Sequence, residues 1–243
     1  MGLDALVFID DNQFEISEVQ HSLPMVDSYR FDGKFPDVAL KMLATCRGLS
    51  TWSVTDEDLR KSEHYEEERQ RKNLLASTVS LEEYLRTLDI KIKVGINRFE
   101  QIPRISQLTN KTNQFNLTSN RYSELDIEEL MKIGKVYDFR VIDKFGDMGI
   151  VGVVILYEDA IDTFLLSCRA LGREVENSML KFVCNENNML NITSKYKKTK
   201  KNIMVENFFE ENGFELNSIE EDTKFYIIAG GPKPKFEVKI ERT

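Results

Sequence analysis

The amino-acid sequence predicts a mixed α/β fold, in which helices flank a central sheet of parallel and antiparallel strands. Apolar runs bounded by polar residues, such as residues 6–9, are typical of strands that are covered on both faces. Ile90, Ile92 and Val94 alternate with polar or small residues, as on a half-buried strand. Segments with helical periodicity lie between such strands, so we expect helices packed on a mixed sheet.

The first part of the chain, residues 1–50, predicts an incomplete α/β domain. Its expected elements are a strand at 6–9, a helix at 14–23, an extended piece at 26–31 and a helix at 35–49 that ends at Gly48. One strand and two helices cannot close a sheet with two covered faces. We therefore expect a remnant whose sheet partners are not in this chain.

A charged helical linker is expected over residues 51–89. Thr55 and Asp58 form a capping box, and the highly charged helix that follows should be a connector with much of its surface in water. We interpret its basic stretch, residues 69–72, as a solvated face. Ser80 and Glu83 give a second capping box before the helix at 81–88.

A second, self-contained domain is expected over residues 90–232, with the element order β-α-α-β-β-β-α-β-α-β. The expected elements are, in order, a strand from 90, helices at 102–113 (Pro103 in the first turn) and 124–133 (capped by Ser123), strands at 135–143, 149–157 and 160–168, a helix at 176–187, a strand at 191–196, a helix at 203–214 and a strand at 223–230. Residues 233–243 are either an added edge strand or a loose tail.

Composition narrows the class of function. The chain has 243 residues, with 33 basic against 41 acidic residues and a net charge of −8, which argues against nucleic acid or an anionic membrane as a partner. It has no apolar run of membrane-spanning length and no signal-like N-terminus, so a cytoplasmic location is expected. Three cysteines without metal-ligand spacing and only two histidines argue against a zinc site or a histidine-based triad.

Asp10 and Asp11 follow the first predicted strand directly. Ligands of parallel sheets gather at the carboxyl ends of strands, and two carboxylates there can hold a hard cation such as Mg²⁺. The same residues are equally typical of a solvated strand end and helix cap. Both interpretations stay open on the spacing alone.

The most informative stretch of the second domain leads from the strand at 160–168 into the next helix. Gly172 lies between them, where it lets backbone N–H groups approach an anion at the helix N-terminus, and Arg169 and Arg173 add positive charge. This segment resembles the pyrophosphate-binding loop of the GNAT acyltransferases, Gln/Arg-x-x-Gly-x-Gly/Ala. It departs from that pattern at Glu174, a bulky acid in place of a small residue.

Residues 208–214, "FFEENGF", resemble the late "FYEKxGF" segment of the same superfamily, except that Phe209 replaces the tyrosine that often protonates the leaving thiolate. The resemblance implies a GNAT-like acyltransferase fold.

A closer resemblance covers nearly the whole chain. The blocks "VFIDDNQFE", "RISQLTNKTNQFNLTSNRY", "DKFGDMGIVGV", "IDTFLLSCRALGREVE" and "KNIMVENFFEENGF" are similar to consecutive signatures of the FkbH-like proteins. That family joins a haloacid-dehalogenase (HAD) phosphatase domain of the IIIC type, which is Rossmann-like, to a GNAT-like domain. The resemblance makes residues 1–50 the C-terminal fragment of the HAD domain.

The FkbH resemblance implies a function for both parts. The family captures a glyceryl unit from 1,3-bisphosphoglycerate, a small phosphorylated three-carbon substrate, removes its phosphate and passes the unit as a thioester to an acyl carrier protein. Asp10 and Asp11 then correspond to the late acidic motif that helps to bind Mg²⁺. The Asp-x-Asp nucleophile motif would lie upstream of residue 1, so this chain alone is not expected to act as a phosphatase or to complete the metal site.

Cys168 is the candidate for the thiol that carries the acyl group. A strand end before a helix N-terminus and beside Arg169 stabilises a thiolate, whereas a buried apolar cysteine is the alternative. Asp162 is expected to face the same side of the strand and is the second candidate catalytic residue. Cys46 and Cys184 lie in apolar helical patterns and are expected in the core.

Two further segments are candidates for substrate or cofactor contacts. Asn113, Gln114 and Asn116 lie where the acyl-acceptor pocket of the fold is expected, although amide-rich segments also close turns. Lys201 and Asn202 precede a helix whose N-terminus is suited to the phosphate of phosphopantetheine or CoA. The lysines of residues 195–201 are either a solvated loop or a surface for an acidic carrier protein.

Three functions are therefore expected in turn. The first is transfer of a glyceryl thioester through Cys168 to an acyl carrier protein. The second is an acyl-CoA-dependent N- or O-acyltransferase, and the third is a non-catalytic module that docks the carrier protein.

Overall fold

A computed structural model describes residues 3, 6–45, 61–187, 192–234, 236 and 238–243. The chain divides into two compact units, Met1–Val54 and Thr55–Thr243, which we describe separately. Among the described helices, none is both long and apolar enough to cross a bilayer.

The first unit contains β1 (Val7–Asp10), α1 (Gln13–Ser22), β2 (Asp27–Arg30) and α2 (Pro36–Thr45). The two strands pair in parallel, from Val7 with Asp27 to Asp10 with Arg30. This confirms the expected strand, extended piece and both helices, but the side chains of β1 are only half-buried rather than covered on both faces. The expected helix end at Gly48, like Cys46 and the box of Thr55 and Asp58, lies outside the described residues.

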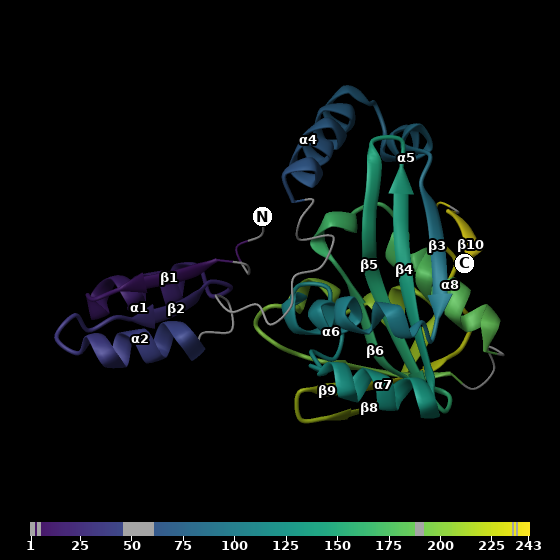
Figure 1. Cartoon of the computed structure of the whole chain (residues 1–243). Coiled ribbons are helices and arrows are strands. Elements are labelled where there is room, and N and C mark those ends of the chain that lie inside the picture. The colour runs from purple at the N-terminus through teal and green to yellow at the C-terminus, as the bar shows by residue number, and fades with distance from the viewer. Residues whose placement is uncertain (1–2, 4–5, 46–60, 188–191, 235, 237) are drawn as a thin grey trace. The chain divides into compact units, whose positions relative to one another are not determined.

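The second unit is a mixed sheet with helices on both faces (Figure 1). Its described elements are α4 (Lys61–Ser77), α5 (Leu81–Leu88), β3 (Lys91–Ile96), the 3₁₀ turn η2 (Phe99–Gln101), α6 (Ile102–Lys111), α7 (Glu124–Ile133), β4 (Lys135–Asp143), β5 (Gly146–Tyr157), β6 (Ala160–Leu166), the 3₁₀ turn η3 (Cys168–Ala170), α8 (Val175–Glu186), β7 (Thr193–Lys197), the 3₁₀ turn η5 (Ile203–Val205), α9 (Phe208–Glu211), β8 (Phe214–Glu220), β9 (Thr223–Ile228) and β10 (Lys239–Arg242). The strand order is β10-β3-β4-β5-β6-β7-β9-β8.

Alternation along the strands separates two cores. On β5, Val153 and Ile155 face a cluster with α6 and α7, whereas Val154 and Leu156 face a larger cluster that includes α5 and α8. On β6, Leu165 faces the first cluster and Phe164 the second. Helices therefore cover both faces of the central strands, as the sequence predicts.

Several local predictions are confirmed. Pro103 lies in the first turn of α6, and Ser123 caps α7 in a reciprocal capping box with Asp126. The Ser80 side chain accepts the Glu83 N–H at 3.1 Å at the start of α5, but the Glu83 carboxylate binds the Val79 N–H instead. Of the two alternatives for the C-terminal residues, the structure has the edge strand, because β10 pairs in parallel with β3.

The sequence prediction is wrong at two places late in the chain. The helix expected over 203–214 is a 3₁₀ turn followed by the four-residue α9. The strand β8 was not expected, because most of its side chains are exposed and no apolar alternation marks it; its pairing with β9 forms it.

The charged helix α4 is not a solvated connector. Arg71, within the basic stretch expected to be a solvated face, is 2% exposed and pairs with Asp143. From the following helix, Tyr84, Leu85 and Leu88 are buried in the larger core. Residues 61–88 thus belong to the second unit, where the sequence predicted a linker.

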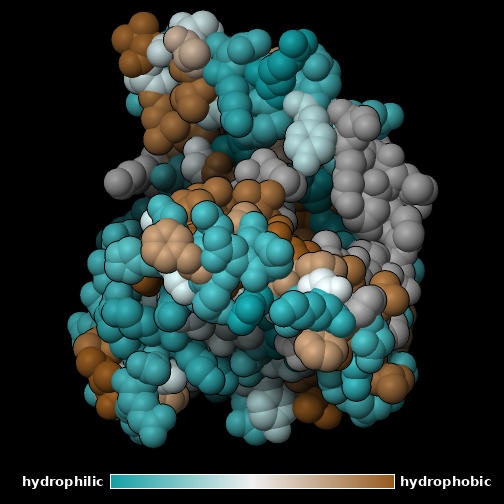
Figure 2. Space-filling view, turned by 90° about the vertical axis from the view of Figure 1, so that its left-hand side faces the viewer, coloured by the Kyte–Doolittle hydropathy of each residue, from teal (hydrophilic) through white to brown (hydrophobic). Residues whose placement is uncertain are grey.

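Exposed apolar side chains occur on both units. On the face drawn in Figure 2, hydrophobic side chains lie singly or in small groups among hydrophilic ones. In the first unit, Phe14 is 72% exposed and Leu40 is 67% exposed.

Candidate functional site

The strands β6 and β7 separate at their carboxyl ends. They pair in parallel only through Ala160 with Thr193 and Ile161 with Ser194. Because the strands are parallel, their carboxyl ends lie at one edge of the sheet, where ligands of such sheets commonly bind. This edge is the candidate site.

The chain itself fills the space between the separated strands. The Leu117 N–H donates to the Phe164 carbonyl at 3.0 Å, and the Leu166 N–H donates to the Phe115 carbonyl at 2.9 Å. On the other side, the Lys197 N–H of β7 donates to the Leu117 carbonyl at 2.8 Å. Residues 115–117 therefore stand in for a strand between β6 and β7.

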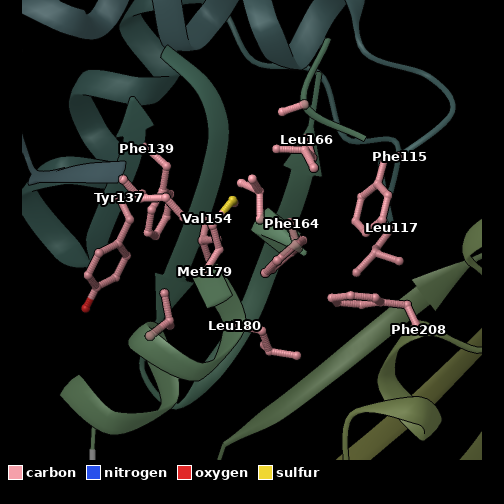
Figure 3. Close-up of a cluster of buried hydrophobic side chains, with 14 of the residues drawn as sticks. Phe115, Leu117, Tyr137, Phe139, Val154, Phe164, Leu166, Met179, Leu180 and Phe208 are labelled. Atoms are coloured by element: carbon pink, nitrogen blue, oxygen red, sulfur yellow. The ribbon is translucent and has the colours of Figure 1, made fainter. Parts of the chain in front are cut away.

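Aromatic packing fixes this segment. The Phe115 and Phe208 rings meet edge to face with centroids 5.1 Å apart, and Phe208 lies 5.1 Å from Phe164 (Figure 3). All three rings are buried, so the segment cannot leave the gap without exposing a hydrophobic cluster.

Two predicted contact residues hold this segment in place. The Asn202 amide donates to the Asn116 carbonyl at 2.8 Å and to the Lys197 carbonyl at 3.0 Å. The Asn116 side chain bonds the Thr112 carbonyl and the Ser119 N–H, and Asn116 and Asn202 are both 0% exposed. These bonds leave both amides with structural partners, so the structural alternative of the sequence analysis describes them.

The neighbouring predicted residues are more accessible. Asn113 is half-exposed, and its side-chain oxygen accepts from Arg121 at 2.6 Å. Gln114 is also half-exposed. Of this amide-rich group, Asn113 and Gln114 are therefore the ones that a substrate can reach.

Cys168 lies at the edge of the sheet as predicted. It begins the 3₁₀ turn η3 directly after β6, and its side chain is exposed, in contrast to the buried Cys184. Burial raises the pKa of the Cys184 thiol to about 12. Of the two cysteines in the described residues, Cys168 is thus the one suited to react.

The loop between Cys168 and α8 has an unusual backbone. Gly172 has φ +73°, and a Cβ built there would meet nothing within 4 Å, so the backbone borders open space. Glu174 precedes α8 with φ +57° and makes no side-chain cap. The glycine thus supplies the close backbone approach that the loop resemblance requires.

The two arginines of this loop have different surroundings. Arg173 is 4% exposed, donates to Glu68 of α4 at 2.8 Å and also bonds the Arg169 carbonyl. Its guanidinium therefore holds the loop against α4 in this conformation. Arg169 is half-exposed and lies beside Cys168.

Two carboxylates stand at the N-terminal end of α8. Burial raises the pKa of Glu176 to about 7, the nearby Glu174 charge adds to the rise, and Glu176 accepts its own backbone N–H. Arg173 acts in the opposite direction. The diphosphate of CoA would meet these acids at the helix end, so the residues present fit that group poorly.

Asp162 does not lie beside Cys168. Six extended residues separate them by on the order of 15–20 Å along β6. The Asp162 carboxylate accepts from Tyr122, from Thr163 at 2.9 Å and from Lys195 at 3.2 Å. These donors lower the pKa of Asp162 against the opposing effect of burial, while the same contact and burial raise that of Tyr122 to about 12.

Asp162 instead borders a groove of about 470 Å³ on the sheet. Its lining includes Tyr157, Thr193, Lys195, Phe225 and Ile227. Sequence reasoning did not find Tyr122, Lys195, Glu68 or Glu176 as members of either site, because only their tertiary contacts mark them.

Asp10 and Asp11 lie at the end of β1, as predicted. Asp10 accepts the Asn12 N–H at 2.8 Å, and Asn12, rather than either aspartate, caps α1. Within the described residues no group of three or more histidine, cysteine or acidic side chains is placed to hold a metal ion. The two carboxylates fit Mg²⁺ only with further ligands or water, because the ion prefers six oxygens.

Comparisons with known proteins find acetyltransferases among solved structures. An IAA acetyltransferase from Bacillus cereus is 15% identical, with a TM-score of 0.40 over 56% of this chain and 97% of its own. The ribosomal-protein-S18-alanine N-acetyltransferase from Escherichia coli is 9% identical, with a TM-score of 0.43 over 60% and 99%. A GNAT-family acetyltransferase from Listeria monocytogenes is 14% identical, with a TM-score of 0.33 over 72% and 91%.

No protein-family model matches the chain, and no curated protein matches it. The structural likeness is too remote to carry a conclusion on activity. The HAD and FkbH parts of the resemblance have no counterpart among these solved structures and stay predictions.

Proposed function

We propose that residues 55–243 transfer an acyl group between a donor and a phosphopantetheine thiol. The supporting observation is the exposed Cys168 thiol, directly after β6 and before the Gly172 loop. A thiol there can accept an acyl group on Sγ and release it to a second thiol, so that the thioester is conserved. The phosphopantetheine belongs to an acyl carrier protein or to CoA.

In its finer form, the acyl group is glyceryl and the donor is 1,3-bisphosphoglycerate. The Cys168 thiolate attacks the acyl-phosphate carbonyl carbon, the C–O bond to phosphate breaks, and inorganic phosphate leaves. The carrier's pantetheine thiol then attacks the thioester and its proton passes to the Cys168 sulfur, which regenerates the thiol. The FkbH resemblance supports this donor and assigns Asp10, Asp11 and Mg²⁺ to the phosphatase half.

An acyl-CoA-dependent N- or O-acyltransferase is the second candidate. The open space at Gly172 favours it, because the backbone there is free to approach a phosphate. Glu174 and the buried Glu176 oppose it through their charge. We derive no step through CoA for this reason.

Intact-protein mass spectrometry tests the proposal. The wild-type chain is incubated separately with 1,3-bisphosphoglycerate, an acyl-loaded carrier protein and acetyl-CoA, and compared with Cys168→Ser and with Cys184→Ser as matched control. We expect an acyl adduct in the wild type and in Cys184→Ser that is absent from Cys168→Ser. An adduct that persists in Cys168→Ser removes this nucleophile.

The same experiment separates the alternatives. Transfer from acetyl-CoA to an amine or alcohol acceptor without an adduct supports the second candidate. Carrier binding that survives Cys168→Ser, with no transfer from any donor, supports a non-catalytic docking module.

A further inference from the structure

We propose that the segment after β7 is the docking surface for an acidic, helical face of a carrier protein. The inference rests on the proposed function, since such a carrier presents the phosphopantetheine thiol. The surface, here the basic–apolar patch, consists of Lys197, Lys198, Lys200, Lys201, Ile203 and Met204.

The patch concentrates positive charge in an acidic chain. Four lysines lie within residues 197–201, whereas the whole chain carries −8. Lys197 and Lys200 are exposed and form no ion pair among the described residues. Lys198 shares Glu206 with Lys224, at 3.5 and 3.1 Å, so one acid serves two lysines. The local excess of positive charge attracts an acidic partner.

Two apolar side chains stand beside these lysines. Ile203 is 55% exposed and Met204 is 63% exposed, in the 3₁₀ turn η5. The buried Asn202 immediately before them is bonded to the Asn116 and Lys197 carbonyls, which fixes the turn. A fixed apolar pair rimmed by cations matches an amphipathic helix whose apolar residue is surrounded by carboxylates.

The patch and the Cys168 thiol share one edge of the sheet. Lys197 bonds Leu117, and Leu117 bonds Phe164 of β6, so residues 115–117 are all that lies between β7 and β6 here. Two strand spacings correspond to on the order of 10 Å. Since β6 ends directly before Cys168, a carrier bound at the patch holds its flexible arm near this thiol.

Nucleic acid or an anionic membrane would also bind lysines. Neither requires the exposed Ile203 and Met204 beside them, and the acidic balance of the whole chain repels both. The apolar pair therefore favours a protein partner.

The test measures binding of a purified acidic acyl carrier protein that lacks its phosphopantetheine arm, by calorimetry at low and high ionic strength. We expect salt-sensitive binding, which Lys197→Glu/Lys200→Glu weakens about tenfold or more. Lys72→Glu, an exposed lysine of α4 without an ion pair among the described residues, is the matched control and should bind as the wild type does. Ile203→Ser/Met204→Ser should weaken binding about fivefold, because apolar contact is lost.

Circular dichroism of each variant establishes that the fold is retained, since all altered side chains are exposed. Equal effects of the control and the patch variants, or absence of carrier binding, overturn the proposal. Tighter binding of a single-stranded RNA or of phosphatidylserine vesicles than of the carrier, lost in the same lysine variants, also overturns it. Because the carrier lacks its arm, docking can hold when acyl transfer fails, and acyl transfer from acetyl-CoA can hold when docking fails.

Discussion

Arg71 and Asp143, 72 residues apart, form a buried two-bond ion pair in which Arg71 Nε and Nη2 donate to the two carboxylate oxygens at 2.7 and 2.9 Å. The pair joins α4 to the turn between β4 and β5. The same carboxylate accepts the Phe145 and Gly146 N–H groups, so it organises the hairpin turn as well.

Removal of one partner should leave a buried charge without compensation. We expect Arg71→Leu to lower the free energy of unfolding by about 3 kcal/mol. Urea denaturation measures this, with Arg69→Leu as matched control, because Arg69 lies on the same helix but its pair with Glu66 is solvent-exposed. The same loss in both variants would show that the buried pair is not the cause.

The strand-like segment 115–117 should depend on Asn202. Asn202→Ala removes two bonds to buried carbonyls, so we expect the free energy of unfolding to fall by about 2 kcal/mol. Hydrogen exchange of the Leu117 amide should become faster. Asn207→Ala, at an exposed position without a cap bond, is the control; unchanged Leu117 exchange in Asn202→Ala would contradict the clamp.

Glu176 should make stability depend on pH. Its folded-state pKa of about 7 lies above the ordinary 4.5, so the folded state holds this proton more tightly than the unfolded state. Its contribution is therefore most favourable below pH 4.5 and is lost as pH rises through 7. We expect Glu176→Gln to exceed the wild type in stability by ~2 kcal/mol near pH 8 and to converge with it near pH 4. Parallel curves for the two proteins would exclude this titration.

The two described cysteines should differ in reactivity. In a Cys46→Ser background, iodoacetamide should modify exposed Cys168 in the folded chain and leave buried Cys184 intact until urea is added. Peptide mass spectrometry at short labelling times measures both sites. Comparable labelling of Cys184 without urea would mean that the core around α8 opens readily.

Much of the fold can be predicted from local pattern. The alternation from Ile90 to Ile96, the capping residue Ser123 and the turn between β4 and β5 each carry their own signal, because strand period, cap chemistry and turn residues act over a few neighbours. The strand β8 has no such signal, since its mostly exposed side chains leave only backbone pairing to form it.

The candidate site divides in the same way. The place of Cys168 after a strand and of Gly172 before a helix follows from the sequence, because both depend on adjacent elements. The sequence alone therefore determined the mixed α/β class, most element positions and the exposed thiol's place at a strand end.

Only the tertiary structure decided which polar residues are structural. Asn116 and Asn202 face buried carbonyls, Asp162 lies with Tyr122 and Lys195 instead of Cys168, and Arg71 lies inside the unit. The physical reason is that the desolvation of an amide or a charge is offset by partners that are distant in sequence and meet only when the sheet assembles. A charged or amide-rich segment has the same local pattern in water as in such a contact.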